Sequence, residues 1–153
     1  MCGIAGRILT SPGQVGADLV KMMDAQAHRG ADSTGFAVYG LPRDDGLIVR
    51  AMGFDRHSMD ADLDDFQHLL RAHGSDFVEQ PSCDESRDTH YNLRVIIREP
   101  TNLSRWVEEA DEFASRLEIQ SVGYSLEIIK DTGDARTVAD KHHVRELIGT
   151  HGL

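Results

Sequence analysis

The chain has 153 residues, of which 40% are hydrophobic, and carries a formal net charge of -10. This length and composition predict a soluble protein with one buried core, so we expect residues 1–153 to form a single domain. The acidic balance argues against nucleic acid and anionic membranes as partners. No apolar run approaches the roughly 20 residues that span a bilayer. Since the N-terminus also lacks the pattern of a signal peptide, the expected location is cytoplasmic.

The first half of the chain is expected to alternate strands and helices. Residues 3–9 are mostly apolar and precede Ser-Pro-Gly, which predicts a strand ended by a turn. Apolar residues recur at helical spacing over 14–27 and predict a helix. Apolar runs at 35–40 and 47–53 flank a turn-rich connector, so we expect a β-hairpin of adjacent strands. A helix is expected over 60–72, capped by its first residue and with its first-turn acids in solvent.

The second half begins with a polar stretch at 74–89, which predicts a mobile loop or an insertion. Alternating apolar residues at 91–98 and 122–128 predict two strands. Between them, a wide apolar stripe at helical spacing predicts a helix over 103–117. A last helix is expected over 134–147, capped by the aspartate at its start.

Cys2 is a candidate nucleophile, because a small residue at position 2 allows the removal of Met1. The new first residue would then carry both a thiol and a free α-amino group. A thiol titrates at about pH 8.5 and an α-amino group at roughly 7.7 to 8.0, so the amine can accept the thiol proton directly or through water. Cys83 lies in the polar stretch and is interpreted as an incidental thiol, so the two cysteines do not indicate a disulfide.

A second cluster, His-Arg-Gly-Ala-Asp-Ser-Thr-Gly at 28–35, places glycines and ionisable residues in a connector between a helix and a strand. Together with Met-Cys-Gly-Ile-Ala-Gly at 1–6, it resembles the class II glutamine amidotransferases of the N-terminal-nucleophile hydrolase superfamily. The resemblance implies an α+β fold, the four-layer αββα sandwich, with residues 1–153 as the N-terminal portion of the amidotransferase domain. The implied activity is hydrolysis of glutamine to glutamate and ammonia through a thioester.

The resemblance also implies roles for individual residues. Cys2 matches the nucleophile of the family. Gly3, Arg29, Gly30 and Asp32 match the framework that positions the N-terminus and the substrate pocket. Neither a cofactor nor a metal is implied for this chain.

Residues 121–134 are similar to stand-alone amidotransferase subunits of glutamate-synthase-like complexes. A partner synthase that receives the ammonia is therefore implied, and any flavin or iron-sulfur centre would belong to that partner.

Two features of the family are missing from the sequence. No Asn-Gly pair occurs to donate hydrogen bonds to the oxyanion, and the chain ends about where the strand that binds the glutamine α-carboxylate would begin. We therefore expect the sandwich to be incomplete at its C-terminal end and the isolated chain to hydrolyse glutamine poorly. Uncovered strand edges would favour association with a partner or with itself as a homo-oligomer.

Three alternatives stay open. The first is a catalytically inactive interaction module of the same fold, which the missing pocket favours. The second is an N-terminal-nucleophile hydrolase that acts on a different amide. The third is a metal site built from histidines such as His68 with His73 or His142 with His143, although residues five apart or adjacent do not share a helix face.

Overall fold

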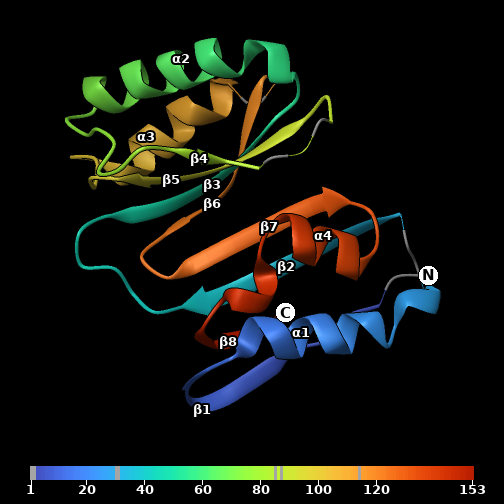
Figure 1. Cartoon of the computed structure of the whole chain (residues 1–153). Helices are drawn as coiled ribbons and strands as arrows, with labels where there is room; N and C mark the ends of the chain where they lie inside the picture. Colours follow the sequence, from blue (N-terminus) through green and yellow to red (C-terminus); the bar gives the residue numbers. More distant parts are fainter. Residues whose placement is uncertain (1–2, 30–31, 85, 87, 114) are drawn as a thin grey trace. The chain divides into compact units, whose positions relative to one another are not determined.

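The chain folds into two compact units, each with its own core (Figure 1). The computed structural model describes residues 3–29, 32–84, 86, 88–113 and 115–153. Unit 1 comprises Met1–Pro42 and Ser125–Leu153, and unit 2 comprises Arg43–Tyr124. In the sequence, unit 2 is thus inserted between the two segments of unit 1.

Unit 1 is built on a four-stranded antiparallel sheet, which its described residues form in the order β1-β8-β2-β7. Its elements, in chain order, are β1 (Arg7–Gly13), α1 (Val15–Asp24), the 3-10 helix η1 (Ala27–Arg29), β2 (Ser33–Gly40), β7 (Leu126–Thr132), α4 (Ala135–Lys141), the 3-10 helix η4 (Val144–Glu146) and β8 (Gly149–Gly152). The helix expected over 14–27 is confirmed as α1.

The core of unit 1 lies between one face of its sheet and the helices α1 and α4. Phe36 and Val38 of β2 form one buried cluster with Leu19 of α1 and Val138 of α4. Each such side chain stabilises the fold by about 1.5 to 3 kcal/mol through its removal from water. Because alternate residues of a strand face opposite sides, Tyr39 faces away from the helices.

The expected strand at 3–9 is wrong in its bounds. β1 begins at Arg7 and continues through the Ser-Pro-Gly sequence that was expected to form a turn. The reason is long-range, since β8 supplies ladder partners at both ends of β1. The register shifts between Ile8 and Gly13, and this irregularity at an edge strand accommodates Pro12, whose nitrogen cannot donate a hydrogen bond.

Unit 2 is a second antiparallel sheet with helices, whose described strands have the order β4-β5-β3-β6. Its elements are β3 (Leu47–Gly53), the 3-10 helix η2 (Arg56–Ser58), α2 (Met59–Ala72), β4 (Ser82–Cys83), β5 (Tyr91–Ile97), α3 (Leu103–Ala110), the 3-10 helix η3 (Asp111–Phe113) and β6 (Leu117–Gly123). This β-α-β-β-α-β succession is typical of ferredoxin-like units. Phe66 of α2 and Trp106 of α3 pack with Val49 and Val95 in one buried cluster, so both helices cover the same face of the sheet.

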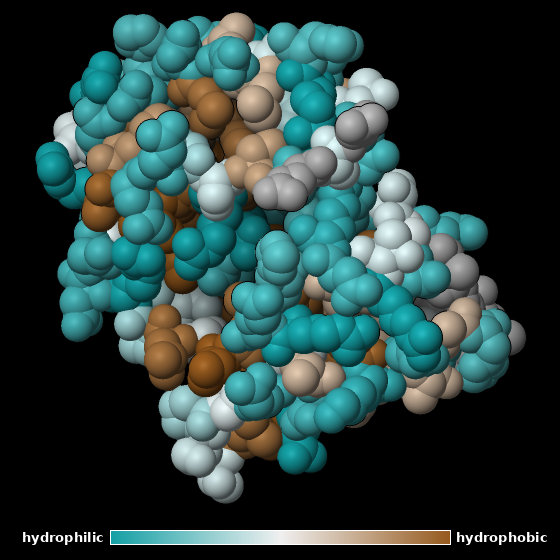
Figure 2. Space-filling view, viewed as in Figure 1, coloured by the Kyte–Doolittle hydropathy of each residue, from teal (hydrophilic) through white to brown (hydrophobic). Residues whose placement is uncertain are grey.

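The two units together confirm an α+β protein. The arrangement in four αββα layers stays a prediction, as does the assignment of residues 1–153 to the N-terminal portion of one amidotransferase domain. Among the described residues, no helix has the length and apolar character that crossing a membrane requires. On the face of the molecule shown in Figure 2, hydrophilic residues predominate and apolar residues form smaller patches.

The expected hairpin between 35–40 and 47–53 is wrong. β2 pairs with β7 and β8 in unit 1, whereas β3 pairs with β5 and β6 in unit 2. The strand expected over 122–128 is likewise divided into the end of β6 and the start of β7. Both differences have one cause, because the chain passes between the units at these points and each strand finds its partners inside its own unit.

The helices of the second half are shorter than expected. The helix predicted over 103–117 ends at Ala110, because Leu117 is already the first residue of β6. The helix predicted over 134–147 ends at Lys141. Its cap is confirmed, since the Asp134 carboxylate accepts a hydrogen bond from the Thr137 N–H at 2.8 Å. The strand at 91–98 and the helix at 60–72 are confirmed as β5 and α2. The expected cap is wrong, because α2 begins at Met59 and Asp60 lies within its first turn.

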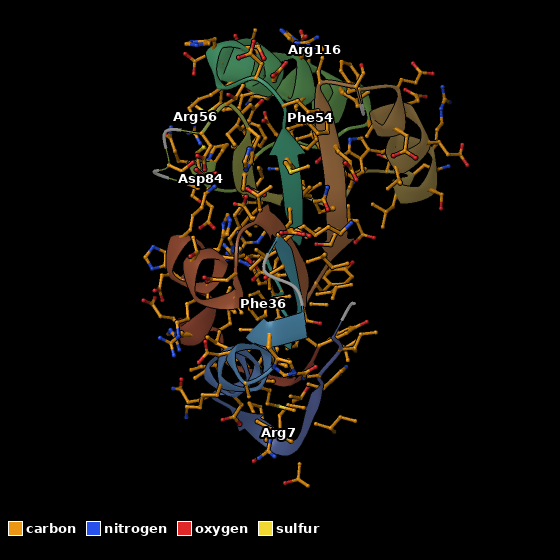
Figure 3. All side chains as sticks on the ribbon, turned by 90° about the vertical axis from the view of Figure 1, so that its right-hand side faces the viewer. Arg7, Phe36, Phe54, Arg56, Asp84 and Arg116 are labelled. Atoms are coloured by element: carbon orange, nitrogen blue, oxygen red, sulfur yellow. The ribbon has the colours of Figure 1, made fainter. Side chains whose placement is uncertain are left out.

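The stretch at 74–89 was expected to be a mobile loop or an insertion, but Arg56 organises its described residues from Asp84 onward (Figure 3). The guanidinium donates to the Asp84 carboxylate at 2.7 Å and to the Ser86 hydroxyl at 3.0 Å. It also donates to the carbonyls of Asp88 and His90, at 3.0 and 3.2 Å. One planar group with several donors therefore holds the part of this stretch that begins at Asp84, which has no apolar residues of its own.

Asp62 corrects the expectation that the first-turn acids of α2 lie in solvent. Its buried carboxylate accepts hydrogen bonds from the Tyr91 hydroxyl at 2.8 Å, the Ser58 hydroxyl at 2.6 Å and the Arg116 guanidinium. Burial opposes ionisation, but the hydrogen bonds from Ser58, Tyr91 and Arg116 together lower the pKa of Asp62 below its ordinary value. An ionised carboxylate thus joins α2 to β5 and to the residue before β6.

Replacing Asp62 by Asn should lower the free energy of unfolding by about 2 to 3 kcal/mol near neutral pH, because Tyr91 and Arg116 lose a charged acceptor. Since its pKa is lower in the folded chain, this carboxylate contributes fully above its ordinary value of 3.8 and loses the contribution as the pH falls through the folded value. The difference between Asp62→Asn and wild type, measured by urea denaturation, should therefore shrink below pH 3.8.

Asp65→Asn is the matched control for that measurement. Asp65 lies on the same helix and pairs with the same Arg116 at 3.0 Å, but its side chain is about half exposed. Its loss should cost less than about 1 kcal/mol. Equal losses in the two variants would contradict the buried network.

Candidate active site

The described residues of the cluster at 28–35 lie at one end of the unit 1 sheet. Ser33 begins β2 and pairs with Thr132, the last residue of β7, while Thr34 lies opposite Asp131. On the other side, η1 follows α1 and ends at Arg29. The connector between α1 and β2 therefore returns the chain to the sheet beside the end of β7.

A turn at Gly133 holds the start of β2. The Gly133 N–H donates to the Asp32 carbonyl at 3.0 Å, and the Thr34 hydroxyl donates to the Gly133 carbonyl at 2.9 Å. Gly133 has a φ of 113°, a conformation that residues with a side chain rarely adopt. The two bonds fix the residues on either side of Ser33, and so fix the backbone where the connector enters the sheet.

The N-terminal segment approaches the connector through Gly3. A Cβ atom at this position would lie 2.6 Å from Gln26 Oε1, so the backbone of Gly3 lies directly against the Gln26 side chain. Gln26 stands between the end of α1 and the start of η1. This contact brings the residue that follows Cys2 to the segment that leads to Arg29.

The structure places only some of the predicted site residues. Gly3 and Asp32 are described, and Arg29 is described by its backbone in η1. Cys2 and Gly30 lie outside the described residues. The structure thus brings Gly3 to the segment before η1 and fixes Asp32 at the end of the sheet, while the roles of all five residues stay predictions.

A buried charged cluster beside the Gly133 turn was not found from the sequence. Asp131 Oδ2 lies 2.7 Å from His142 Nε2 and 2.7 Å from Lys141 Nζ. The Asp131 side chain is only 1% exposed, and both partners come from the last residues of α4 and its cap. The sequence did show an acid before Thr-Gly-Asp and a Lys-His pair near the end of an expected helix, but spacing alone does not bring them together.

Three of the four histidines considered as metal ligands, His73, His142 and His143, lie beside carboxylates instead. His73 Nε2 lies 2.9 Å from a Glu109 oxygen, and His142 contacts Asp131 as described. Within the described part of the chain, no three His, Cys, Asp or Glu side chains form a group that could hold a metal ion. The structure therefore gives the histidine-site alternative no further support.

Similarity to a known protein bears on the family of this chain. No family model matches the chain. The chain is 31% identical over 159 aligned residues to a protein of Methanothermobacter thermautotrophicus (strain ATCC 29096 / DSM 1053 / JCM 10044 / NBRC 100330 / Delta H) that is provisionally named a glutamine amidotransferase. The alignment covers 100% of this chain and 50% of that protein, so the chain spans about half the length of this relative. The name of that relative does not state a class of amidotransferase.

Replacing Gly133 by Ala should lower the free energy of unfolding by about 1 to 3 kcal/mol, because an alanine at this φ is strained. Gly35→Ala is the matched control, since an added Cβ there meets its nearest atom at an ordinary 3.6 Å. Thermal denaturation of both variants would measure the difference. If Gly133→Ala were as stable as wild type, the turn would not fix the start of β2 as described.

Proposed function

We propose that this chain is the N-terminal portion of a class II glutamine amidotransferase domain, with Cys2 as the nucleophile. The observation that carries the amidotransferase part of the proposal is the similarity along the whole chain to a protein named a glutamine amidotransferase. The class and the nucleophile are proposed from the motifs at 1–6 and 28–35. The contact between Gly3 and Gln26 supports it, because it brings the N-terminal segment to the connector that bears Arg29.

In the proposed reaction, removal of Met1 leaves Cys2 with its own α-amino group as a base. The amine takes the thiol proton, directly or through water, and the sulfur attacks the side-chain carbonyl carbon of glutamine. Collapse of the tetrahedral intermediate breaks the carbon–nitrogen bond, and ammonia leaves with the transferred proton. Water then attacks the thioester, which releases glutamate and restores the thiol.

The framework residues have positioning roles in this proposal. Gly3 places the N-terminal segment against Gln26, where a longer side chain would displace the glutamine side chain. Arg29 and Gly30 form the part of the connector that helps to position the terminus. Asp32, whose carbonyl is held by the Gly133 N–H, ends the connector at a fixed point.

The four-layer αββα sandwich is also part of the proposal, and the sheet of unit 1 supports it. Its helices cover one face, whereas the opposite face bears Ile8, His151 and Tyr39 in one row across neighbouring strands. Ile8 is 85% exposed and Leu153 is 58% exposed. An apolar sheet face of this kind is suited to packing against a second sheet, which is how a sandwich buries it.

The remaining parts of the proposal concern partners. Glutamine is the substrate, the ammonia passes to a synthase subunit in the cytoplasm, and no cofactor is needed for the hydrolysis itself. Association of the chain with itself through uncovered strand edges belongs to the same proposal.

Covalent labelling tests the nucleophile. The chain, produced with its native N-terminus, should lose Met1 and form a single adduct on Cys2 with a diazoketone analogue of glutamine, and free glutamine should slow the labelling. Cys83 should not react, because burial and the neighbouring Asp84 raise the pKa of its thiol and keep it protonated at neutral pH. Intact-mass measurement followed by peptide mapping would locate the adduct.

The chain offers a matched pair of variants for this experiment. Cys83→Ala should label like wild type, whereas Cys2→Ala should not label at all. Retention of Met1, or an adduct that survives in Cys2→Ala, would exclude Cys2 as the nucleophile.

A further inference from the structure

Asp131 and the residues at the end of α4 form the most deeply buried charged cluster described in unit 1. The carboxylate has two cationic or hydrogen-bonding partners at 2.7 Å, Lys141 Nζ and His142 Nε2. Its other oxygen accepts a hydrogen bond from the Thr132 N–H, also at 2.7 Å. A buried carboxylate persists only where such partners replace its hydration, so the end of α4 is tied to the end of β7.

The end of β7 is in turn tied to the start of β2. Asp131 lies directly opposite Thr34 in the ladder, and both side chains are buried. Residues opposite each other in a ladder share a face, so Thr34 lies on the side of the sheet that meets α4. The Thr34 hydroxyl and the Asp32 carbonyl both bond to Gly133, two residues beyond Asp131.

The first turn of α4 contacts the other flank of the connector. Asp134 caps the helix, and Arg136 Nη2 lies 2.7 Å from an Asp24 carboxylate oxygen. Asp24 is the last residue of α1, immediately before the segment that holds Gln26 and η1. One short helix thus contacts the chain on both sides of the connector between α1 and β2.

We propose that α4 is the positioning element of the connector, and that His142, the more deeply buried of the two partners of Asp131, anchors it. The bond between His142 and Asp131 keeps β7 and the Gly133 turn in the conformation that holds Asp32 and Thr34. His142 and Asp131 are positioning residues in this scheme, since they act through Gly133. The consequence for labelling of Cys2 rests on the function proposed above, whereas the consequence for the backbone at 32–34 does not.

Hydrogen–deuterium exchange on the full chain tests the anchor directly. His142→Leu should speed exchange of the backbone amides in β2 by at least about tenfold, because it removes a hydrogen bond to a buried charge. Exchange in β5 of unit 2 should not change. His142→Gln retains an amide donor toward Asp131 and should restore most of the protection.

Two further variants keep the test decisive. His143→Asn changes the exposed neighbour of His142 at a position with φ of 53°, which asparagine tolerates, and it should exchange like wild type. Thr34→Val removes only the bond to the Gly133 carbonyl and should speed exchange at the start of β2 even if His142→Leu does not fold. The proposal is overturned if β2 keeps its protection in His142→Leu or in Thr34→Val, or if the Gln and Leu variants lose protection equally.

Labelling with the diazoketone analogue adds a functional arm. His142→Leu should lower the maximal rate of adduct formation on Cys2 and leave the concentration for half-maximal rate unchanged, and His142→Gln should recover the rate. Wild-type protein that does not label at Cys2 would overturn the proposed function, and the exchange measurements would then decide the anchor alone. Normal labelling with unchanged exchange would overturn the anchor alone.

Discussion

The buried carboxylate of Asp131 is the constraint on which much of unit 1 depends. A charge that is almost fully removed from water is stable only beside partners that replace its hydration. Lys141 and His142 supply them, so α4 must end against β7, and the turn between β7 and α4 must be short. Gly133 makes that short turn possible, and its peptide groups then fix the first residues of β2.

Unit 2 contains two buried carboxylates among its described residues, and each is paired with an arginine. Asp62 is neutralised by Arg116 and Asp84 by Arg56, and in each case the carboxylate is nearly inaccessible while the guanidinium remains partly exposed. For Asp84, burial opposes ionisation, but hydrogen bonds from the Asn92 N–H, Ser86 and Arg56 lower its pKa. The Asp84 network holds a segment without apolar residues, so hydrogen bonding determines the backbone there, whereas the Asp62 network borders the apolar core through Tyr91.

The features that were predicted correctly from the sequence are those that local interactions determine. Apolar periodicity predicted the helix α1 and the strand β5. The cap of α4 was predicted because Asp134 stands at the start of the helix, where the Thr137 N–H has no acceptor within the helix. Long-range pairing could not be predicted in this way, which is why the expected hairpin was wrong although both of its strands exist. Periodicity also gives no sign that Asp62 is buried, because its partners Tyr91 and Arg116 lie far along the chain.

The candidate site was likewise predictable from the sequence only in part. The motif residues were recognised from the sequence, but the contacts of Gly3 with Gln26 and of Asp32 with Gly133 required the fold.

The way in which the chain leaves and re-enters unit 1 bears on how such a protein can change during evolution. Gly40 donates to the Ser125 carbonyl at 2.8 Å inside unit 1, and Arg43 donates to the Tyr124 carbonyl at 2.9 Å inside unit 2. Within each unit, the residue where the chain leaves is therefore hydrogen-bonded to the residue where it returns. A tight turn from Gly40 to Ser125 would close the sheet of unit 1 without the intervening residues. A ferredoxin-like unit joined in this manner can be acquired, lost or diversified while the neighbouring pairs of β2 and β7 stay intact, as in other successful domain insertions.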